Sequence, residues 1–405
     1  MLMSLLTLSG TLFAQDPQLE ALRATLTTMR AQTRGAGFDT QVPAAAMAKA
    51  KHQLRDWIES KLLSSNDEEE TAALEAELNQ ELQTLAVPEE KAPEATLVQN
   101  RFGTLSNVRL TLHSGILVVS TGIGILCQDD TSLYGYKRVD GRWQRIWESE
   151  QQDYSPEQYK PQSVFKVLVW RQSEKGKEAS PIYVMTLGNH WGCSSAWHPV
   201  YYRVWRIAPS GSKLLIDGSQ MAWMRTGSYA VGSIGQRPLR STAPVDVLIE
   251  FTVGSVDVMV HNREAVLHFL IEGDKVRRVA PVALSPRDFV DEWLTHDWQE
   301  SGPWSASEAV HPWHRKLHAD WVGGTFQDNT KRCQTPGFWQ VVFAPRDEHK
   351  NNEDQKPLYF LVQWSPPYHF TMKEIGAKPW PGCTDDDLEA DEWRTLFSTQ
   401  EWRYW

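Results

Sequence analysis

The sequence predicts an α+β protein with mainly antiparallel β structure. A short helical region at the N-terminus precedes propeller-like or sandwich-like four-strand repeats, and a mixed α/β part follows at the C-terminus. Three observations predict this class. Residues 17–87 are rich in Ala, Leu, Glu and Gln, which favour helices. Beyond residue 96, β-branched and aromatic residues alternate in short runs typical of half-buried strands. Similar hairpins then recur at intervals of 67 and 66 residues, which indicates a repeat.

The N-terminus carries an apolar run from Leu2 to Ala14 that gives way to a polar segment. This run matches the hydrophobic region of a secretory signal peptide and is shorter than the roughly 20 residues of a membrane-spanning helix. We therefore predict a signal peptide at 1–14, cleavage before Gln15, and a secreted or periplasmic protein of bacterial type. A buried N-terminal helix turn is the alternative, because no Lys or Arg precedes the run and Leu12 stands where a small residue is favoured.

Three helices are predicted before residue 88, separated by glycine and proline breaks, at 17–33, 44–63 and 67–86. In the second helix, apolar side chains recur at helical spacing and make one face: Leu54, Trp57, Ile58 and Leu62. The segment from Pro88 to Pro93 has the composition of a linker. The predicted regions are therefore 15–95 for the helices and linker, 96–284 for an antiparallel β domain, and 285–405 for a mixed region.

The β domain contains six candidate strands, at 108–112, 116–121, 164–170, 182–187, 245–253 and 256–260. Three hairpins are also predicted, at 133–139 with 142–147, 200–207 with 213–216, and 266–271 with 276–279. Asp-Gly, Ser-Gly and Gly-Asp pairs at their turns suit tight hairpins, because glycine tolerates positive φ. Four strands per unit are typical of a β-propeller blade. An antiparallel sandwich or open sheet remains the alternative, since three units do not close a ring.

The C-terminal region is predicted to hold helices at 286–294 and 312–321 and strands at 337–344, 358–364 and 368–375. A last helix is predicted from Thr384, whose side chain can cap it while Asp387 stands three residues further on.

The four cysteines favour disulfides, because an even number in an exported chain indicates pairing. We predict bonds between Cys127 and Cys193, at matching places of neighbouring repeats, and between Cys333 and Cys383. A four-thiolate zinc site is disfavoured, since it normally uses two Cys-x-x-Cys motifs and the chain has none.

The net charge of −10 is concentrated near the N-terminus, where residues 15–95 hold fifteen acidic and eight basic residues. No basic stripe follows, so we predict neither a nucleic-acid partner nor stable membrane insertion after leader removal.

The densest histidine group is His311, His314 and His318 with Asp320. In a helix from Pro312, His314 and His318 stand one turn apart and could bind zinc as a pair. No glutamate lies between them as in the metalloprotease motif. We favour a structural role beside a packing face of Trp313, Leu317 and Trp321, and we predict no cofactor.

The loop from Gly188 to Pro199 concentrates tryptophans and histidines between two predicted strands. Loops at the end of a sheet often gather ligands. The tryptophans could stack on a sugar ring while the other side chains supply hydrogen bonds, so the predicted ligand-binding residues are Asn189, His190, Trp191, Trp197 and His198. A disulfide-anchored loop whose tryptophans pack on the sheet is the structural alternative.

These features favour a non-catalytic extracytoplasmic binding or interaction module, with glycans among its candidate ligands and a ligand or protein partner of unknown identity. The alternative is a secreted hydrolase, either a glycosidase or a zinc enzyme. No Gly-x-Ser-x-Gly nucleophile motif occurs, and the catalytic residues of a hydrolase are therefore unknown. Strand acids such as Asp246, Glu250 and Asp257 are the candidates for an acid–base pair.

Overall fold

The structure is a computed structural model. It describes residues 16–35, 40–64, 71–85, 102–126, 128–151, 153–154, 160–171, 181–190, 197–223, 245–256, 262–278, 283, 285–319, 323–345, 356–365 and 369–387. The chain divides into two compact units. Unit 1 comprises Met1–Trp170, Val184–Ser194 and Pro209–Ser212, and unit 2 comprises Arg171–Tyr183, Ser195–Ala208 and Lys213–Trp405. The fold is α+β with mostly antiparallel sheets, which confirms the predicted class.

Unit 1 begins with three helices, α1 (Pro17–Gln32), α2 (Ala44–Ser64) and α3 (Thr71–Gln83). The side chain of Asp16 caps α1 by accepting a hydrogen bond from Gln18 N. The predicted apolar face of α2 is buried in full, because Leu54, Trp57, Ile58 and Leu62 are at most 2% exposed. The predicted start of the third helix falls at residues 65–70, which lie outside the described residues.

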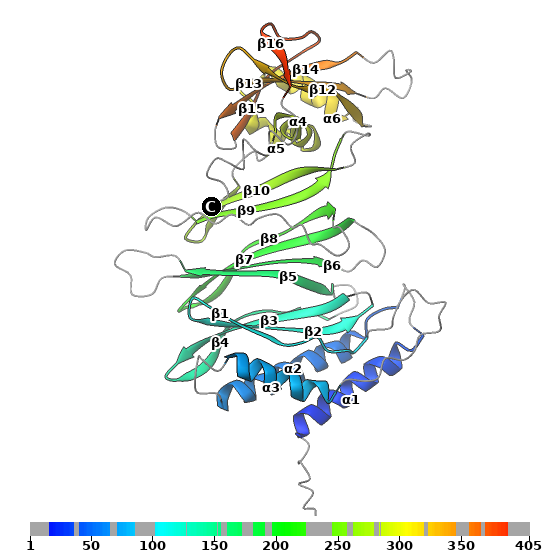
Figure 1. The fold of residues 1–405 in the computed structure, drawn as a ribbon, viewed down its shortest axis with the longest axis vertical. Coiled ribbons are helices and arrows are strands. Elements are labelled where there is room, and N and C mark those ends of the chain that lie inside the picture. Colours follow the sequence, from blue (N-terminus) through cyan, green and yellow to red (C-terminus); the bar gives the residue numbers. More distant parts are fainter. Residues whose placement is uncertain are drawn as a thin grey trace, which may run out of the picture. The chain divides into compact units, whose positions relative to one another are not determined.

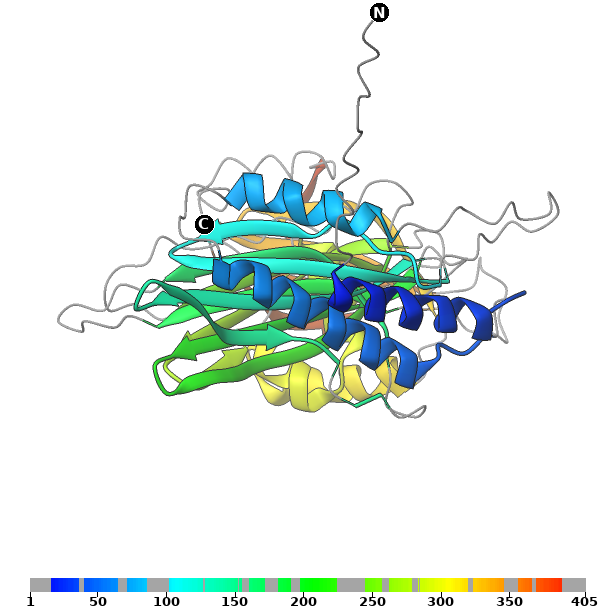
Figure 2. The same cartoon turned by 90° about the horizontal axis from the view of Figure 1, so that it is seen from below.

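These helices cover one face of the first sheet, a meander of β1 (Arg109–His113), β2 (Ile116–Ile125), β3 (Gln128–Val139) and β4 (Arg142–Ser149) (Figures 1 and 2). Adjacent strands are antiparallel. Asp140 and Gly141 at the predicted β3–β4 turn have φ values of 51° and 77°. A type I′ turn requires positive φ at both of its central residues. The predicted tight hairpin turn at Asp140-Gly141 is therefore confirmed.

The second sheet also has four strands, ordered β5 (Gln162–Arg171), β6 (Ile182–His190), β7 (Trp197–Ala208) and β8 (Gly211–Trp223). The third sheet, in unit 2, has the order β11 (Lys275–Arg278), β10 (Asn262–Glu272), β9 (Val245–Gly254), with antiparallel pairs. All three predicted hairpins are present. The candidate strand 256–260 falls mostly on residues outside the described part, and propeller-like closure stays a prediction.

The C-terminal part of unit 2 packs helices on a fourth, five-stranded sheet (Figure 1). The helices are α4 (Pro286–Thr295), α5 (Trp298–Ser301) and α6 (His311–Ala319). The sheet has the order β15 (His369–Gly376), β14 (Leu358–Ser365), β13 (Phe338–Pro345), β12 (Gly324–Cys333), β16 (Cys383–Asp387). The predicted helix at 286–294 is present as α4, with Ser285 as its N-cap and Pro286 in its first turn. The shared core includes Phe289, Trp293 and Phe360.

The predicted helix from Thr384 is wrong. Residues 383–387 form β16, which pairs antiparallel with β12 in the register Cys333 opposite Cys383. The predicted disulfide between these two cysteines is confirmed. A capping interaction contributes only about 1 kcal/mol, so the covalent bond and the backbone pairing outweigh it. Cys127 and Cys193 lie outside the described residues, and their bond stays a prediction.

Within the described residues, no helix is both long and apolar enough to cross a membrane.

Candidate binding site

The first sheet has two chemically different faces, because side chains alternate along each strand. Leu117, Val119 and Ile123 of β2 are buried in the core shared with the helices. The alternate positions of β2, Ser120 and Gly122, line a groove on the opposite face. The sheet therefore uses one face for the core shared with the helices, while its other face is mixed, with buried Ile116 and Val118 beside the groove positions Ser120 and Gly122.

The groove has a volume of about 540 Å³ and lies within unit 1. From the segment before β1 and from the first three strands it is lined by Ser106, Asn107, Arg109, Thr111, His113, Val118, Ser120, Thr121, Gly122, Asp129 and Thr131. Residues 163–167 of β5 complete the lining. Hydroxyl and amide side chains make up seven of the sixteen described lining residues, and they can both donate and accept hydrogen bonds.

Close backbone packing shapes one end of the groove. A Cβ atom on Gly122 would lie 2.7 Å from Ser106 Oγ and 3.1 Å from Asp129 Cβ, so only glycine fits without movement of its neighbours. Beside it, the Ser106 hydroxyl donates to Asp129 Oδ2 over 2.7 Å. The absence of a side chain at Gly122 thus gives room for the hydrogen bond between Ser106 and Asp129.

The β5 strand is the edge of the second sheet, and side chains of β3 receive its backbone N–H groups. Gln162 N donates to Asp130 Oδ1 over 3.2 Å, and Val164 N donates to Thr131 Oγ1 over 3.3 Å. These two contacts place residues 163–167 along the groove.

A buried ion pair fixes Asp130 from the helix side. Lys51 Nζ of α2 lies 2.8 Å from Asp130 Oδ2, and both side chains are 2% exposed. Near this pair, Glu150 accepts hydrogen bonds from the hydroxyls of Tyr134 and Tyr154. Burial, and next the charge of Glu150, raise the pKa of both tyrosines well above the usual range. These contacts join α2 and the segment after β4 to β3, and we interpret them as structural.

The sequence-predicted ligand residues lie at the ends of two strands of the second sheet, not in the groove. Asn189 is buried near the end of β6, whose last residue is His190. Trp197 and His198 begin β7 and are half-buried. Trp191 lies outside the described residues. The aromatic loop therefore stays a prediction.

Two histidines of α6, His314 and His318, form hydrogen bonds with backbone carbonyls at the C-terminal end of α4. His314 Nε2 lies 3.1 Å and 3.0 Å from the carbonyl oxygens of Trp293 and His296. His318 Nδ1 lies 3.0 Å from the carbonyl of Leu294. Carbonyls only accept, so each of these ring nitrogens carries a proton and cannot ligate zinc. Burial lowers the pKa of His314, which favours its neutral form.

This geometry agrees with the structural role favoured by the sequence, since Leu317 is buried and Trp313 packs against the same core. Asp320 and Trp321 lie outside the described residues. Among the residues that are described, no group of three or more His, Cys, Asp or Glu side chains is placed to hold a metal ion.

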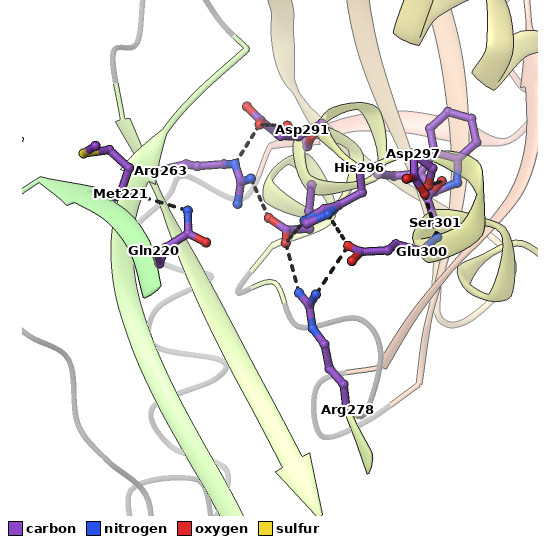
Figure 3. A network of polar contacts seen from close by, with 12 residues as sticks. Gln220, Met221, Arg263, Arg278, Asp291, His296, Asp297, Glu300 and Ser301 are labelled. Atoms are coloured by element: carbon purple, nitrogen blue, oxygen red, sulfur yellow. Dashed lines mark hydrogen bonds and ion pairs between the residues drawn. The ribbon is translucent and has the colours of Figure 1, made fainter. Parts of the chain in front are cut away.

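A second polar cluster joins the third sheet to α4 and α5 (Figure 3). Arg263 of β10 pairs with Asp291 at 2.6 Å and with Glu292 at 2.5 Å. His296 lies between Glu292 and Glu300, with a nitrogen 2.7 Å from the first and 2.5 Å from the second. We interpret this cluster as structural, because its charges are matched pairwise.

Asp246 and Glu250, two of the strand acids considered for catalysis, stand four residues apart on β9, and their pairing stays a prediction. Asp257 is outside the described residues.

Comparison with known proteins gives no family. No family model matches the chain, and no curated protein matches it. A solved structure of a glycoside hydrolase is 9% identical and covers 70% of this chain and 90% of its own, with a TM-score of 0.20. An alpha-L-arabinofuranosidase from Lactobacillus brevis is 11% identical (73% and 81% covered, TM-score 0.19). A Cellvibrio cellulosa alpha-L-arabinanase complexed with arabinohexaose is 12% identical. It covers 67% of this chain and 77% of its own, with a TM-score of 0.19. Likeness at this level carries no argument about function.

The groove itself was not predicted from the sequence, although β1 carries a signal for it. In Arg109-Leu110-Thr111-Leu112-His113, polar and apolar residues alternate strictly. Such alternation indicates a strand with one apolar and one polar face. What the sequence could not show is that β5 would lie along the polar face.

Proposed function

We propose that this protein is a non-catalytic binding module that acts outside the cytoplasm and holds a saccharide chain in the groove of unit 1. The observation that carries the proposal is the lining of the groove, in which hydroxyl and amide side chains outnumber apolar ones. Saccharides present many hydroxyl groups, and Ser, Thr and Asn can donate to and accept from each of them.

The dimensions of the groove support a chain rather than a single sugar. Arg109, Thr111 and His113 are alternate residues of β1 that all line it, and they span about 13 Å of strand. The half-buried Phe165 also lines the groove and adds apolar surface. A short oligosaccharide has this length and this mixture of polar edges and apolar faces.

One further observation supports a binding role, and two support an extracytoplasmic location. Asp129 is the one acidic residue among those described along the groove, whereas glycoside hydrolysis commonly uses two carboxyl groups. Disulfides such as Cys333–Cys383 persist mainly in oxidising compartments. The apolar run at residues 2–14 is consistent with export.

The test is calorimetric titration of the full-length protein with a panel of oligosaccharides, followed by variants. Removing two groove hydroxyls in Thr111→Val with Ser120→Ala should weaken binding about tenfold or more, because each net hydrogen bond contributes roughly 0.5–1.5 kcal/mol. Ser212→Ala, at an exposed serine of β8 outside the groove, is the matched control and should bind normally. Release of reducing sugar should stay at background.

Two results would overturn the proposal. One is a panel in which no saccharide binds at millimolar concentration. The other is binding that survives the double variant but is lost in Trp197→Ala, which would move the site to the aromatic loop.

A further inference from the structure

The groove carries positive charge in an acidic chain. Arg109 and Lys166 line it as permanent cations, and His113 stands beside them on the same strand face as Arg109. The whole chain has a net charge of −10. Basic side chains therefore gather where the proposed ligand would lie, although the net charge of the chain is negative.

Unlike many other basic side chains, these three have no carboxylate partner among the described residues. Within the described part of the chain, none of Arg109, His113 and Lys166 takes part in an ion pair. Many arginines elsewhere do, including Arg145 with Glu59 and Arg203 with Asp217. In a protein with an excess of acidic side chains, the described carboxylates thus leave the groove cations without counterions.

The one acid among the described groove residues is too far along the sheet to neutralise Arg109. Arg109 stands opposite Ser120, which stands opposite Leu133 of β3. Asp129 lies four residues from Leu133, which is about 13 Å of strand. That exceeds the screening length of about 8–10 Å at physiological salt. Asp129 in addition accepts the Ser106 hydroxyl, so the groove has one cationic end and one end closed by this pair.

Lys166 lies toward the cationic end. The contacts of β5 advance along β3 in chain direction, since Gln162 N meets Asp130 and Val164 N meets Thr131. Lys166 is two residues further along β5, in the direction of the positions Arg109, Ser120 and Leu133, which stand opposite one another. It lines the same groove. An arginine fork and a lysine ammonium near one position are suited to a carboxylate, which accepts two parallel hydrogen bonds from a guanidinium.

We propose that the groove is specific for acidic saccharides and that Arg109 and Lys166 bind a uronic-acid carboxylate of the chain. This inference rests on the proposed function and names its substrate class. Ser120, opposite Arg109, and Thr111 bind neighbouring hydroxyl groups of the same ligand. The ligand carboxylate supplies the counterion that the described residues do not.

The experiment compares a galacturonic acid tetramer with its fully methyl-esterified form, which has the same backbone and no charge. The acid should bind at least about tenfold more tightly than the ester, as expected for charge-assisted hydrogen bonds. Its affinity should fall as salt rises from about 50 mM to about 500 mM, while that of the ester should not.

Variants separate the charge from the fold. Arg109→Gln should weaken acid binding about tenfold and ester binding much less, at unchanged melting temperature, and Lys166→Gln should act in the same direction. Arg142→Gln is the matched control, because Arg142 is an exposed arginine of β4 that does not line the groove. Arg109→Lys should restore part of the affinity through charge alone.

The outcomes are distinguishable. Equal binding of acid and ester, or a loss in Arg142→Gln as large as in Arg109→Gln, overturns the acidic specificity while the saccharide function stands. Preference for a sulfated galactose tetramer over the carboxylated one overturns the carboxylate assignment. Absence of any saccharide binding, with binding of an acidic peptide instead, overturns both proposals.

Discussion

The buried guanidinium of Arg263 offers the sharpest test of how unit 2 is held together. Its Nε lies 2.6 Å from Asp291 and its Nη2 lies 2.5 Å from Glu292, and none of the three side chains is more than 8% exposed. In Arg263→Met, both carboxylates lose this countercharge in a site that water barely reaches. Breaking such a pair costs about 3–5 kcal/mol. Ser255 Oγ and Val256 N still donate to Asp291, so we expect a loss of about 3 kcal/mol, at the lower end of that range.

The assay is urea unfolding of the full chain, followed by circular dichroism and tryptophan fluorescence. The control is Arg203→Met, whose 2.7 Å pair with Asp217 is half exposed on the carboxylate side and should contribute at most about 1 kcal/mol. A loss of less than about 1 kcal/mol for Arg263→Met, or a loss equal to the control, would refute the reasoning. Arg263→Met with Glu292→Gln should recover part of the loss, because one stranded charge is removed.

The same ion pair gives a pH dependence of known sign. Burial raises the pKa of Glu292, but the charge of Arg263 and the contact with His296 lower it to about 2, against an ordinary value of 4.5. A carboxyl with a lowered folded pKa stabilises the protein above its unfolded pKa, and this contribution is lost as pH falls through the folded value. Arg263→Met removes the main lowering cause. The difference in unfolding free energy between wild type and variant should therefore shrink as pH falls from about 4.5 to about 2, and a constant difference would contradict the assignment.

Three further changes test unit 1, unit 2 and the groove. Asp130→Ala strands the buried ammonium of Lys51 and should cost about 3–5 kcal/mol in urea unfolding, whereas replacing both residues by apolar ones should cost much less. Opening the Cys333–Cys383 bond in a double Ser variant releases a loop with a sequence separation of 50 and should cost up to about 4 kcal/mol in urea unfolding. Gly122→Ala places a Cβ 2.7 Å from Ser106 Oγ, so Ser106 must move, and both saccharide affinity and the melting temperature should fall. Unchanged affinity would separate this glycine from the site.

The parts of the fold that the sequence predicted well depend on local interactions. Asp140-Gly141 needs only its own backbone preference to form a hairpin turn, and the helix predicted at 286–294 begins at Pro286, whose fixed φ suits a first helical turn. Thr384 shows the limit of such reasoning. Its capping box is a local signal, but a partner strand about 50 residues earlier decides the structure, and a propensity scale does not contain that partner.

The candidate site was harder to predict for the same physical reason. The sequence favoured a ligand site in the aromatic loop at residues 188–199, because its tryptophans and histidines are close along the chain. The groove, in contrast, is lined by the segment before β1, by β1, β2 and β3, and by the distant strand β5. Six of its sixteen described lining residues are serines and threonines, which are common on strand surfaces. Only the approach of β5, through Gln162 and Val164, makes them one surface.

One face of the first sheet packs on the helices and the other lines part of the groove. Binding and stability should therefore respond to different substitutions. Its helix-facing side buries Leu117 and Val119 at 0% exposure, and a change there removes core packing. Arg109 on the groove side is exposed and has no ion pair among the described residues, so its loss leaves no described buried group unpaired. An exposed cation without a carboxylate partner among the described residues contributes little to folding. If the groove binds an acidic saccharide as we propose, Arg109→Gln should therefore lower affinity without changing the melting temperature.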